Sequence, residues 1–182
     1  MRALLVWELG DNFGHAGLLI RIGEELAAKG VEVYVALQDT LKAAPFLKNQ
    51  NITLLAAPYG RIHPKPRPEG PPRQVLTYAD DVALCGYDRA DELASLLRAW
   101  HGLFDLVQPD ILLADAAPTA LIAAQGRPFI KVISGLGYGV PPLETPMPPF
   151  RYWEQHDPAV LLDREQQTLA VINDAQTLLG RP

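Results

Sequence analysis

Cysteine is nearly absent from the sequence: Cys85 is the single one among 182 residues, so no disulfide can form within the chain. Such sparing use of cysteine is typical of a reducing compartment, and we expect a cytoplasmic protein. Long hydrophobic runs are absent too, because no stretch reaches the about 18 apolar residues that a membrane-spanning helix needs. The start of the chain has an apolar run that ends at Glu8, which is too short for a secretory signal peptide.

Basic residues are also few, since 16 Lys and Arg stand against 21 Asp and Glu, for a net charge of −5. Nucleic acids and anionic membranes bind basic surfaces, so we expect neither as a partner. The histidines His63, His101 and His156 show no metal-ligand spacing with one another or with Cys85. We therefore expect no metal site and no cofactor.

Apolar residues make up 48% of the chain and charged residues 20%, which is typical of a globular domain with its own core. The length predicts one domain, residues 1–182. Short apolar runs predict buried strands at 3–7, 31–37, 52–56, 111–114 and 129–133. Helices are predicted at 15–29, at 39–49, at 74–108 with a break near Gly86, at 118–125 and at 159–179. This alternation predicts an α/β fold: a Rossmann-like, doubly wound parallel sheet with helices on both faces.

The loop after the first strand is the first place to look for a ligand, because open parallel sheets bind ligands beyond the carboxyl ends of their strands. Gly10, Gly14 and Gly17 in and after this loop do not have the spacing of a dinucleotide fingerprint. Asp39 follows the second strand, where dehydrogenases hold a ribose, but the simpler interpretation is an N-cap of the next helix. A dehydrogenase is thus the weakest of the enzyme hypotheses.

Two groups of motifs carry a more specific signal. Gly14-His15 opens a helix that runs into Leu26-Ala27-Ala28-Lys29-Gly30-Val31-Glu32-Val33. Farther along, Pro109-Asp110-Ile111-Leu112-Leu113-Ala114-Asp115 precedes a helix rich in small residues and then Gly126-Arg127-Pro128. In this order and spacing, the sequence resembles the N-terminal domain of the GT-B glycosyltransferases of family 1, which include macrolide and flavonoid glucosyltransferases. Leu18 departs from the family, which often has proline three residues after the histidine.

The resemblance implies roles for two residues. In the family, the histidine that matches His15 is the general base that deprotonates an acceptor hydroxyl, and the aspartate that matches Asp115 orients its imidazole. Each also has a structural interpretation. A histidine at a helix start can simply satisfy backbone groups, and Asp115 can be the N-cap of the helix that Pro118 begins.

The variable loops of this family build the acceptor pocket, which implies substrate contacts from Asn12, Phe13 and Gly14. Tyr138 and Trp153, together with nearby aromatic residues, could line an apolar acceptor pocket of the kind that small molecules occupy. The alternative is that these aromatic rings pack on the last helix. Residues 135–139 have the glycine content of a phosphate loop, but no helix follows them, so we interpret them as a substrate-side loop.

By resemblance, the chain is one half of a GT-B enzyme. The nucleotide-sugar donor would be held by a C-terminal domain that is absent from this sequence or by a partner chain, so we expect little transferase activity from these residues alone. The function implied is inverting transfer of a sugar to a hydroxyl of a small-molecule acceptor. The alternatives are one subunit of a split enzyme, a non-catalytic binding module and a nucleotide-sugar epimerase. The surface that would meet the second domain could also form a homodimer.

Overall fold

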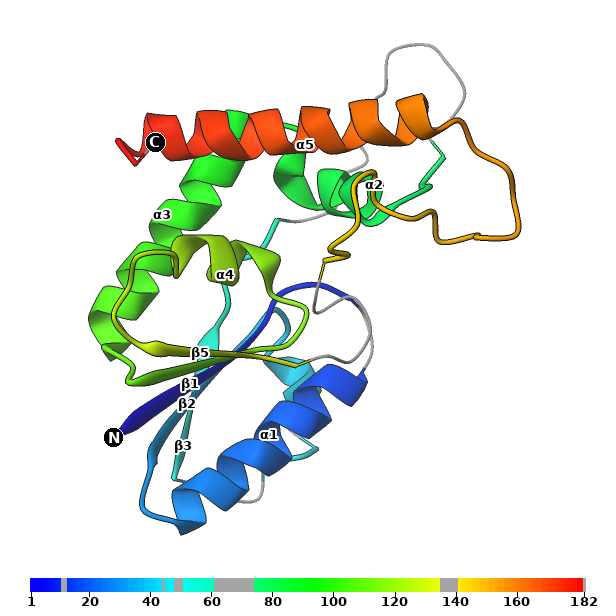
Figure 1. Ribbon diagram of the computed structural model, residues 1–182. Helices are drawn as coiled ribbons and strands as arrows, with labels where there is room; N and C mark the ends of the chain where they lie inside the picture. Colours follow the sequence, from blue (N-terminus) through cyan, green and yellow to red (C-terminus); the bar gives the residue numbers. More distant parts are fainter. Residues whose placement is uncertain (11–12, 44, 48–50, 61–73, 135–140, 182) are drawn as a thin grey trace. The chain divides into compact units, whose positions relative to one another are not determined.

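The computed structural model describes residues 1–10, 13–43, 45–47, 51–60, 74–134 and 141–181. The chain divides into two compact units, one made of Met1–Tyr59 and Leu96–Val140 and the other of Gly60–Ser95 and Pro141–Pro182. The first unit is built on a five-stranded sheet in the order β3-β2-β1-β4-β5 (Figure 1). The strands are β1 (Arg2–Trp7), β2 (Glu32–Leu37), β3 (Ile52–Ala56), β4 (Ile111–Ala114) and β5 (Ile130–Ile133).

All four strand pairings are parallel, and β1 lies in the middle between β2 and β4. Parallel strands that are covered on both faces are apolar throughout, and in β1 every residue from Ala3 to Trp7 is buried. The chain leaves β1 toward β2 on one side, and β4 lies on the other side. The carboxyl ends of β1 and β4 therefore border the point where the strand order reverses, which is where such sheets bind ligands.

Helices cover both faces of this sheet, as the sequence predicts (Figure 1). On one face, α1 (Phe13–Ala28) packs its buried side chains onto alternate residues of β1 and β2. The core of this face contains Ala3, Leu5, Trp7, Ala16, Leu19, Ile20, Val33, Val35 and Leu37. On the other face lie α4 (Pro118–Ala123) and the end of α3 (Ala90–Val107), whose Phe104 ring packs edge-on against Phe129 at a centroid distance of 5.2 Å.

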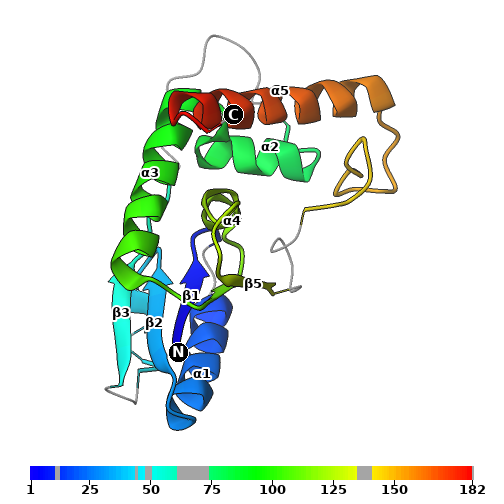
Figure 2. The ribbon, with the colours of Figure 1, turned by 60° about the vertical axis from the view of Figure 1, so that its left-hand side comes forward.

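The second unit is helical in its described part. It contains α2 (Tyr78–Val82), the π-helical turn η2 (Ala83–Tyr87), the start of α3 and α5 (Pro158–Leu178), which lies beside α2 (Figure 2). Gly86 adopts φ +104° within η2, a conformation that favours glycine. It accounts for the predicted break in the helical stretch 74–108.

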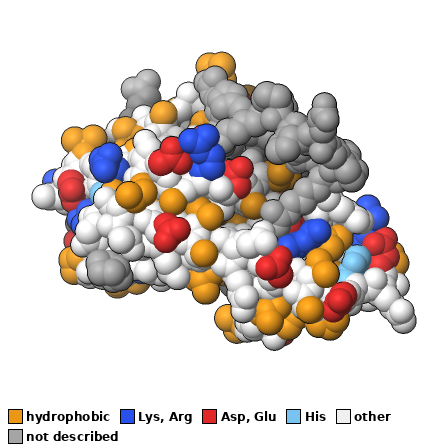
Figure 3. Space-filling view, turned by 90° about the horizontal axis from the view of Figure 1, so that it is seen from above, with side chains coloured by type: hydrophobic (Ala, Val, Ile, Leu, Met, Phe, Trp, Pro, Cys, Tyr) orange, Lys and Arg blue, Asp and Glu red, His pale blue; other side chains and the backbone are white. Residues whose placement is uncertain are grey.

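A buried ion pair joins α2 to α5 within this unit. The Asp80 carboxylate is 1% exposed and accepts hydrogen bonds from Nη1 of Arg164 at 2.9 Å and from the backbone N–H groups of Leu76 and Thr77. Burial alone raises the pKa of Asp80, but these donors outweigh it and bring the pKa below its ordinary value. Figure 3 shows one face of the molecule, where apolar side chains lie among charged ones. The exposed large apolar residues of α5 are Val160, Leu169 and Leu178.

The predicted strands are confirmed to within one residue, and the helices predicted at 15–29, 118–125 and 159–179 are confirmed to within two residues at each end. The helix predicted at 39–49 is wrong: the described part of this stretch contains only the 3-10 turn η1 (Leu41–Ala43). Pro45 has no backbone N–H, so it cannot donate the hydrogen bond that would continue this turn as a helix. No helix in the described ranges is long and apolar enough to span a membrane.

Two glycines in helices should respond to alanine in opposite ways. A Cβ on Gly23 of α1 would lie 3.2 Å from Cγ1 of Val33, whereas a Cβ on Gly102 of α3 would meet nothing within 4 Å. We expect Gly102→Ala to stabilise the protein by about 0.5–1 kcal/mol through helix propensity. Gly23→Ala should destabilise it by about 1 kcal/mol, because overpacking exceeds the same gain. Urea unfolding of both variants measures this; a more stable Gly23→Ala protein would show that the contact between α1 and β2 can relax.

Removal of the arginine partner of Asp80 should destabilise the second unit. In Arg164→Met, the buried carboxylate loses its counterion, and we expect the free energy of unfolding to fall by about 3 kcal/mol at neutral pH. The loss should shrink as the pH falls through the lowered pKa of Asp80, where the wild type also loses the ion pair. Arg151→Met, which removes the exposed pair with Glu154, is the matched control and should cost about 0.5 kcal/mol or less.

Candidate functional site

Two side chains that lie 100 residues apart in the sequence meet at the carboxyl ends of β1 and β4. His15 is the third residue of α1, the helix that follows the loop after β1. Asp115 comes directly after β4 and is tied to β1 by its backbone N–H, which donates to the carbonyl of Val6 at 2.9 Å. The adjacency of β1 and β4 in the sheet is what brings the two residues together.

The imidazole of His15 and the carboxylate of Asp115 are hydrogen bonded. Nδ1 of His15 lies 2.9 Å from Oδ2 of Asp115, and the aspartate side chain is 1% exposed while the histidine is 22% exposed. A carboxylate can only accept, so Nδ1 carries the hydrogen of this bond and Nε2 of the neutral ring keeps a lone pair. This arrangement can take a proton at Nε2 and stabilise the resulting imidazolium through Asp115.

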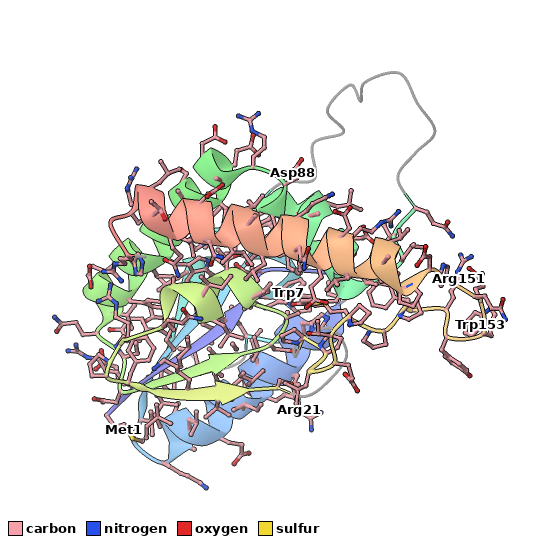
Figure 4. The ribbon with its side chains drawn as sticks, turned by 45° about the horizontal axis from the view of Figure 1, so that its top comes forward. Met1, Trp7, Arg21, Asp88, Arg151 and Trp153 are labelled. Carbon is pink, nitrogen blue, oxygen red and sulfur yellow. The ribbon has the colours of Figure 1, made fainter. Side chains whose placement is uncertain are left out.

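The indole ring of Trp7 packs against the imidazole ring of His15. The two rings are stacked, with centroids 5.5 Å apart and planes 17° apart. Trp7 itself is fully buried at the end of β1, where Figure 4 labels it, and its indole N–H donates to the carbonyl of Leu9. The ring of His15 is thus fixed by packing on one side and by a hydrogen bond at Nδ1, so Nε2 is the ring nitrogen that does not face Asp115.

Gly10 lies next to Nε2 of His15. It adopts φ +94°, and a Cβ placed on it would lie 3.5 Å from Nε2 of His15. The positive φ favours glycine at this position, whereas a Cβ would only be in ordinary van der Waals contact with the imidazole. The carbonyl of Gly10 accepts a hydrogen bond from the side-chain amide of Gln38 at the end of β2, which ties the loop to the neighbouring strand.

The structural interpretation of Asp115 as a helix N-cap is wrong. The N-cap position of α4 is Ala117, which has no side chain able to cap. The interpretation of Asp39 as a cap is confirmed, because its Oδ1 accepts the backbone N–H groups of Leu41 at 3.0 Å and Lys42 at 3.4 Å. Asp39 caps the turn η1, while Asp115 has its side chain turned to His15.

Glu8 is a residue near this site that the sequence analysis missed. It follows β1 directly, is 1% exposed, and accepts hydrogen bonds from the indole N–H of Trp100 at 2.9 Å and from the backbone N–H of Thr119. Burial raises the pKa of Glu8 to about 8, although these donors act in the opposite direction. The one signal in the sequence was a carboxylate that interrupts an apolar run.

The other predicted contact residues are placed as follows. Gly14 precedes His15 in the first turn of α1. The ring of Phe13 is 53% exposed and contacts Phe46 at a centroid distance of 6.3 Å. Trp153 belongs to the second unit, where it is 68% exposed beside Tyr152 and is labelled in Figure 4. Asn12, Tyr138 and the predicted loop 135–139 lie outside the described residues.

Among the described residues, no group of three His, Cys, Asp or Glu side chains could hold a metal ion.

A scan against models of known protein families finds no match, and a search of curated proteins finds none. Among solved structures, the chain is similar to SsfS6, a glycosyltransferase of Streptomyces sp. SF2575, in two crystal structures, one of them complexed with thymidine diphosphate. Both share 16% identity with this chain at a TM-score of 0.44 and cover 72% of it. The matched region spans 38% of the first SsfS6 chain and 37% of the second. The similarity is one of fold, an α/β arrangement around a parallel sheet.

Proposed function

We propose that this chain is the acceptor-binding half of a glycosyltransferase that moves a sugar from a nucleotide-sugar to a hydroxyl of a small molecule. The observation that carries this proposal is the hydrogen bond between Nδ1 of His15 and the buried carboxylate of Asp115, which leaves Nε2 as a base at the ligand-binding edge of the sheet. The motifs around Gly14-His15 and Pro109–Asp115, which resemble family 1 GT-B enzymes, support the choice of sugar transfer over other reactions.

In the proposed reaction, Nε2 of His15 takes the proton of the acceptor hydroxyl as its oxygen attacks the anomeric carbon of the sugar. The bond from that carbon to the diphosphate oxygen breaks, and the nucleoside diphosphate leaves with the bonding electrons. Attack opposite the leaving group inverts the anomeric configuration. An alcohol is a weak nucleophile at neutral pH, so a base in this position accelerates the attack, and Asp115 stabilises the imidazolium that forms.

The remaining parts of the proposal concern the two substrates. A second domain or a partner chain would hold the nucleotide-sugar, and this chain would supply the base and the acceptor pocket. By resemblance, we assign acceptor contacts to Asn12, Phe13 and Gly14, and we keep Tyr138 and Trp153 as proposed aromatic contacts to the acceptor. The exposed ring of Phe13 supports an apolar acceptor, because small-molecule sites are lined mainly by apolar and aromatic groups.

Substitution of His15 should slow sugar transfer more for an acceptor whose hydroxyl keeps its proton than for one that is already ionised. The test uses the protein together with its donor-binding part, and two acceptors of similar size: 4-nitrobenzyl alcohol, which keeps its proton, and 4-nitrophenol, which is largely ionised near about pH 8. With the alcohol, His15→Ala should lower kcat/KM by about 10²–10⁴-fold. With the phenol, the loss should be at least about ten-fold smaller, because no proton has to be removed. Release of nucleoside diphosphate is the measurement.

Matched controls distinguish the base from general damage. Asp115→Asn should lower turnover of the alcohol, whereas Asp110→Asn, the same change at the exposed start of β4, should leave it unchanged. Equal losses for both acceptors in His15→Ala would refute the role of base. Conversion of the nucleotide-sugar without any acceptor would indicate an epimerase, and tight acceptor binding without nucleotide release would indicate a binding module.

A further inference from the structure

We infer that Glu8 is a positioning residue for His15 and Asp115: its buried side chain holds the segment from Asp115 to Thr119 in the conformation that directs the Asp115 carboxylate to the imidazole. The inference rests on the proposed function insofar as that pair is the catalytic pair. It adds a residue that touches neither the reacting atoms nor the imidazole and acts through Asp115.

Glu8 supplies the cap that α4 lacks. The N-cap residue of α4, Ala117, has no polar side chain, and Pro118 has no backbone N–H. The first N–H groups of the helix therefore belong to Thr119 and Ala120. Both donate to Oε1 of Glu8, that of Ala120 at 3.4 Å. A residue at the end of β1 thus caps a helix that begins 110 positions later in the chain.

The backbone between Asp115 and α4 needs such support. Ala116 adopts φ +46°, a left-handed conformation that costs an alanine about 1 kcal/mol or more. Its carbonyl accepts the backbone N–H groups of Leu9 at 2.9 Å and of Glu8 at 3.4 Å. Glu8 therefore holds this segment at two places, through its backbone at Ala116 and through its carboxyl at Thr119. Because Asp115 directly precedes Ala116, the direction of its side chain depends on the same conformation.

Trp7, the last residue of β1, and Glu8, which follows it directly, contact the two sides of the His15–Asp115 site from opposite faces of the sheet. Successive residues of a strand point to opposite faces of the sheet. Trp7 points to the face of α1 and stacks on His15, while Glu8 points to the face of α3 and α4 and contacts Trp100 and Thr119. Two consecutive residues thus fix the histidine ring from one face and the segment that carries Asp115 from the other.

The experiment reads the His15–Asp115 hydrogen bond directly, by ¹⁵N NMR of histidine-labelled protein. The hydrogen bond at one ring nitrogen determines which nitrogen is protonated, so wild-type His15 should show a protonated Nδ1 and a bare Nε2. Loss of signals in His15→Gln assigns them among the four histidines of the chain. In Glu8→Ala, we expect the signature of a protonated Nδ1 to be lost, because the carboxylate of Asp115 is no longer held toward the ring.

A pair of further variants keeps the test decisive if Glu8→Ala does not fold. The spectra are recorded above the pKa of Glu8, about 8, where both of its carboxyl oxygens only accept hydrogen bonds. In Glu8→Gln, the amide oxygen can still accept from Thr119 and Ala120, but the amide nitrogen then faces the indole N–H of Trp100, and two donors oppose each other. Glu8→Gln should therefore disturb the tautomer, and Glu8→Gln/Trp100→Phe, which removes the opposing donor, should restore it. Val33→Ala is the control for a destabilised core, because Val33 is buried at the other end of the β1–β2 pairing from Glu8, and it should keep the wild-type signature.

The outcomes separate the two proposals. A wild-type tautomer in Glu8→Ala, or in Glu8→Gln and the double variant alike, would overturn the positioning role of Glu8 and leave the catalytic pair intact. Loss of the tautomer in Val33→Ala as well would also overturn it, because any loss of stability would then have the same effect. Absence of a protonated Nδ1 from the wild type would instead count against the pair itself and so against the proposed function.

Discussion

The parallel pairing of β1 with β4 is the constraint on which the candidate site depends. It is formed by two apolar strands, and it joins segments whose following loops lead to His15 and to Asp115. Because the chain continues from β1 toward β2 and β4 lies on the opposite side, the carboxyl ends of β1 and β4 border the point where the strand order reverses, which is where such sheets bind ligands. The backbone hydrogen bond from Asp115 to Val6 extends this pairing by one more residue and brings the carboxylate level with the first turn of α1.

The buried carboxylates in the described part of the chain differ in how completely their oxygens are hydrogen bonded. Glu8 and Asp80 each have donors at the carboxyl group that come from at least two other segments. Asp115 is as buried as these two, but only Oδ2 has a partner, and Oδ1 has no hydrogen-bond partner among the described residues. An unsatisfied buried acceptor costs about 1–3 kcal/mol. Such a cost is typical of functional sites, where side chains are arranged for a ligand and not for stability alone.

The sequence predicted what depends on local pattern and missed what depends on distant partners. Strands such as β1 and β4 were found because short apolar runs have few other uses, and Gly86 marked a real break in a helix. Family resemblance supplied the pair of His15 and Asp115, which no local rule could join across 100 residues. The helix predicted at 39–49 failed because Pro45, which has no backbone N–H, lies in the middle of that stretch. Glu8 could not be interpreted, because its partners Trp100 and Thr119 lie 92 and 111 positions away.

The imidazole of His15 is preorganised: packing and a hydrogen bond fix its orientation without a bound ligand. Stacking on Trp7 restricts the tilt of the ring, and the bond to Asp115 restricts its rotation, so a bound hydroxyl would meet Nε2 in one orientation. Gly10 keeps the space beside Nε2 free of a side chain. Orientation of this kind lowers a reaction barrier because its entropic cost has been met during folding. In the proposed reaction, this rigidity would come from buried contacts on both faces of β1, so the proposal links the reactivity of the histidine to the stability of the sheet.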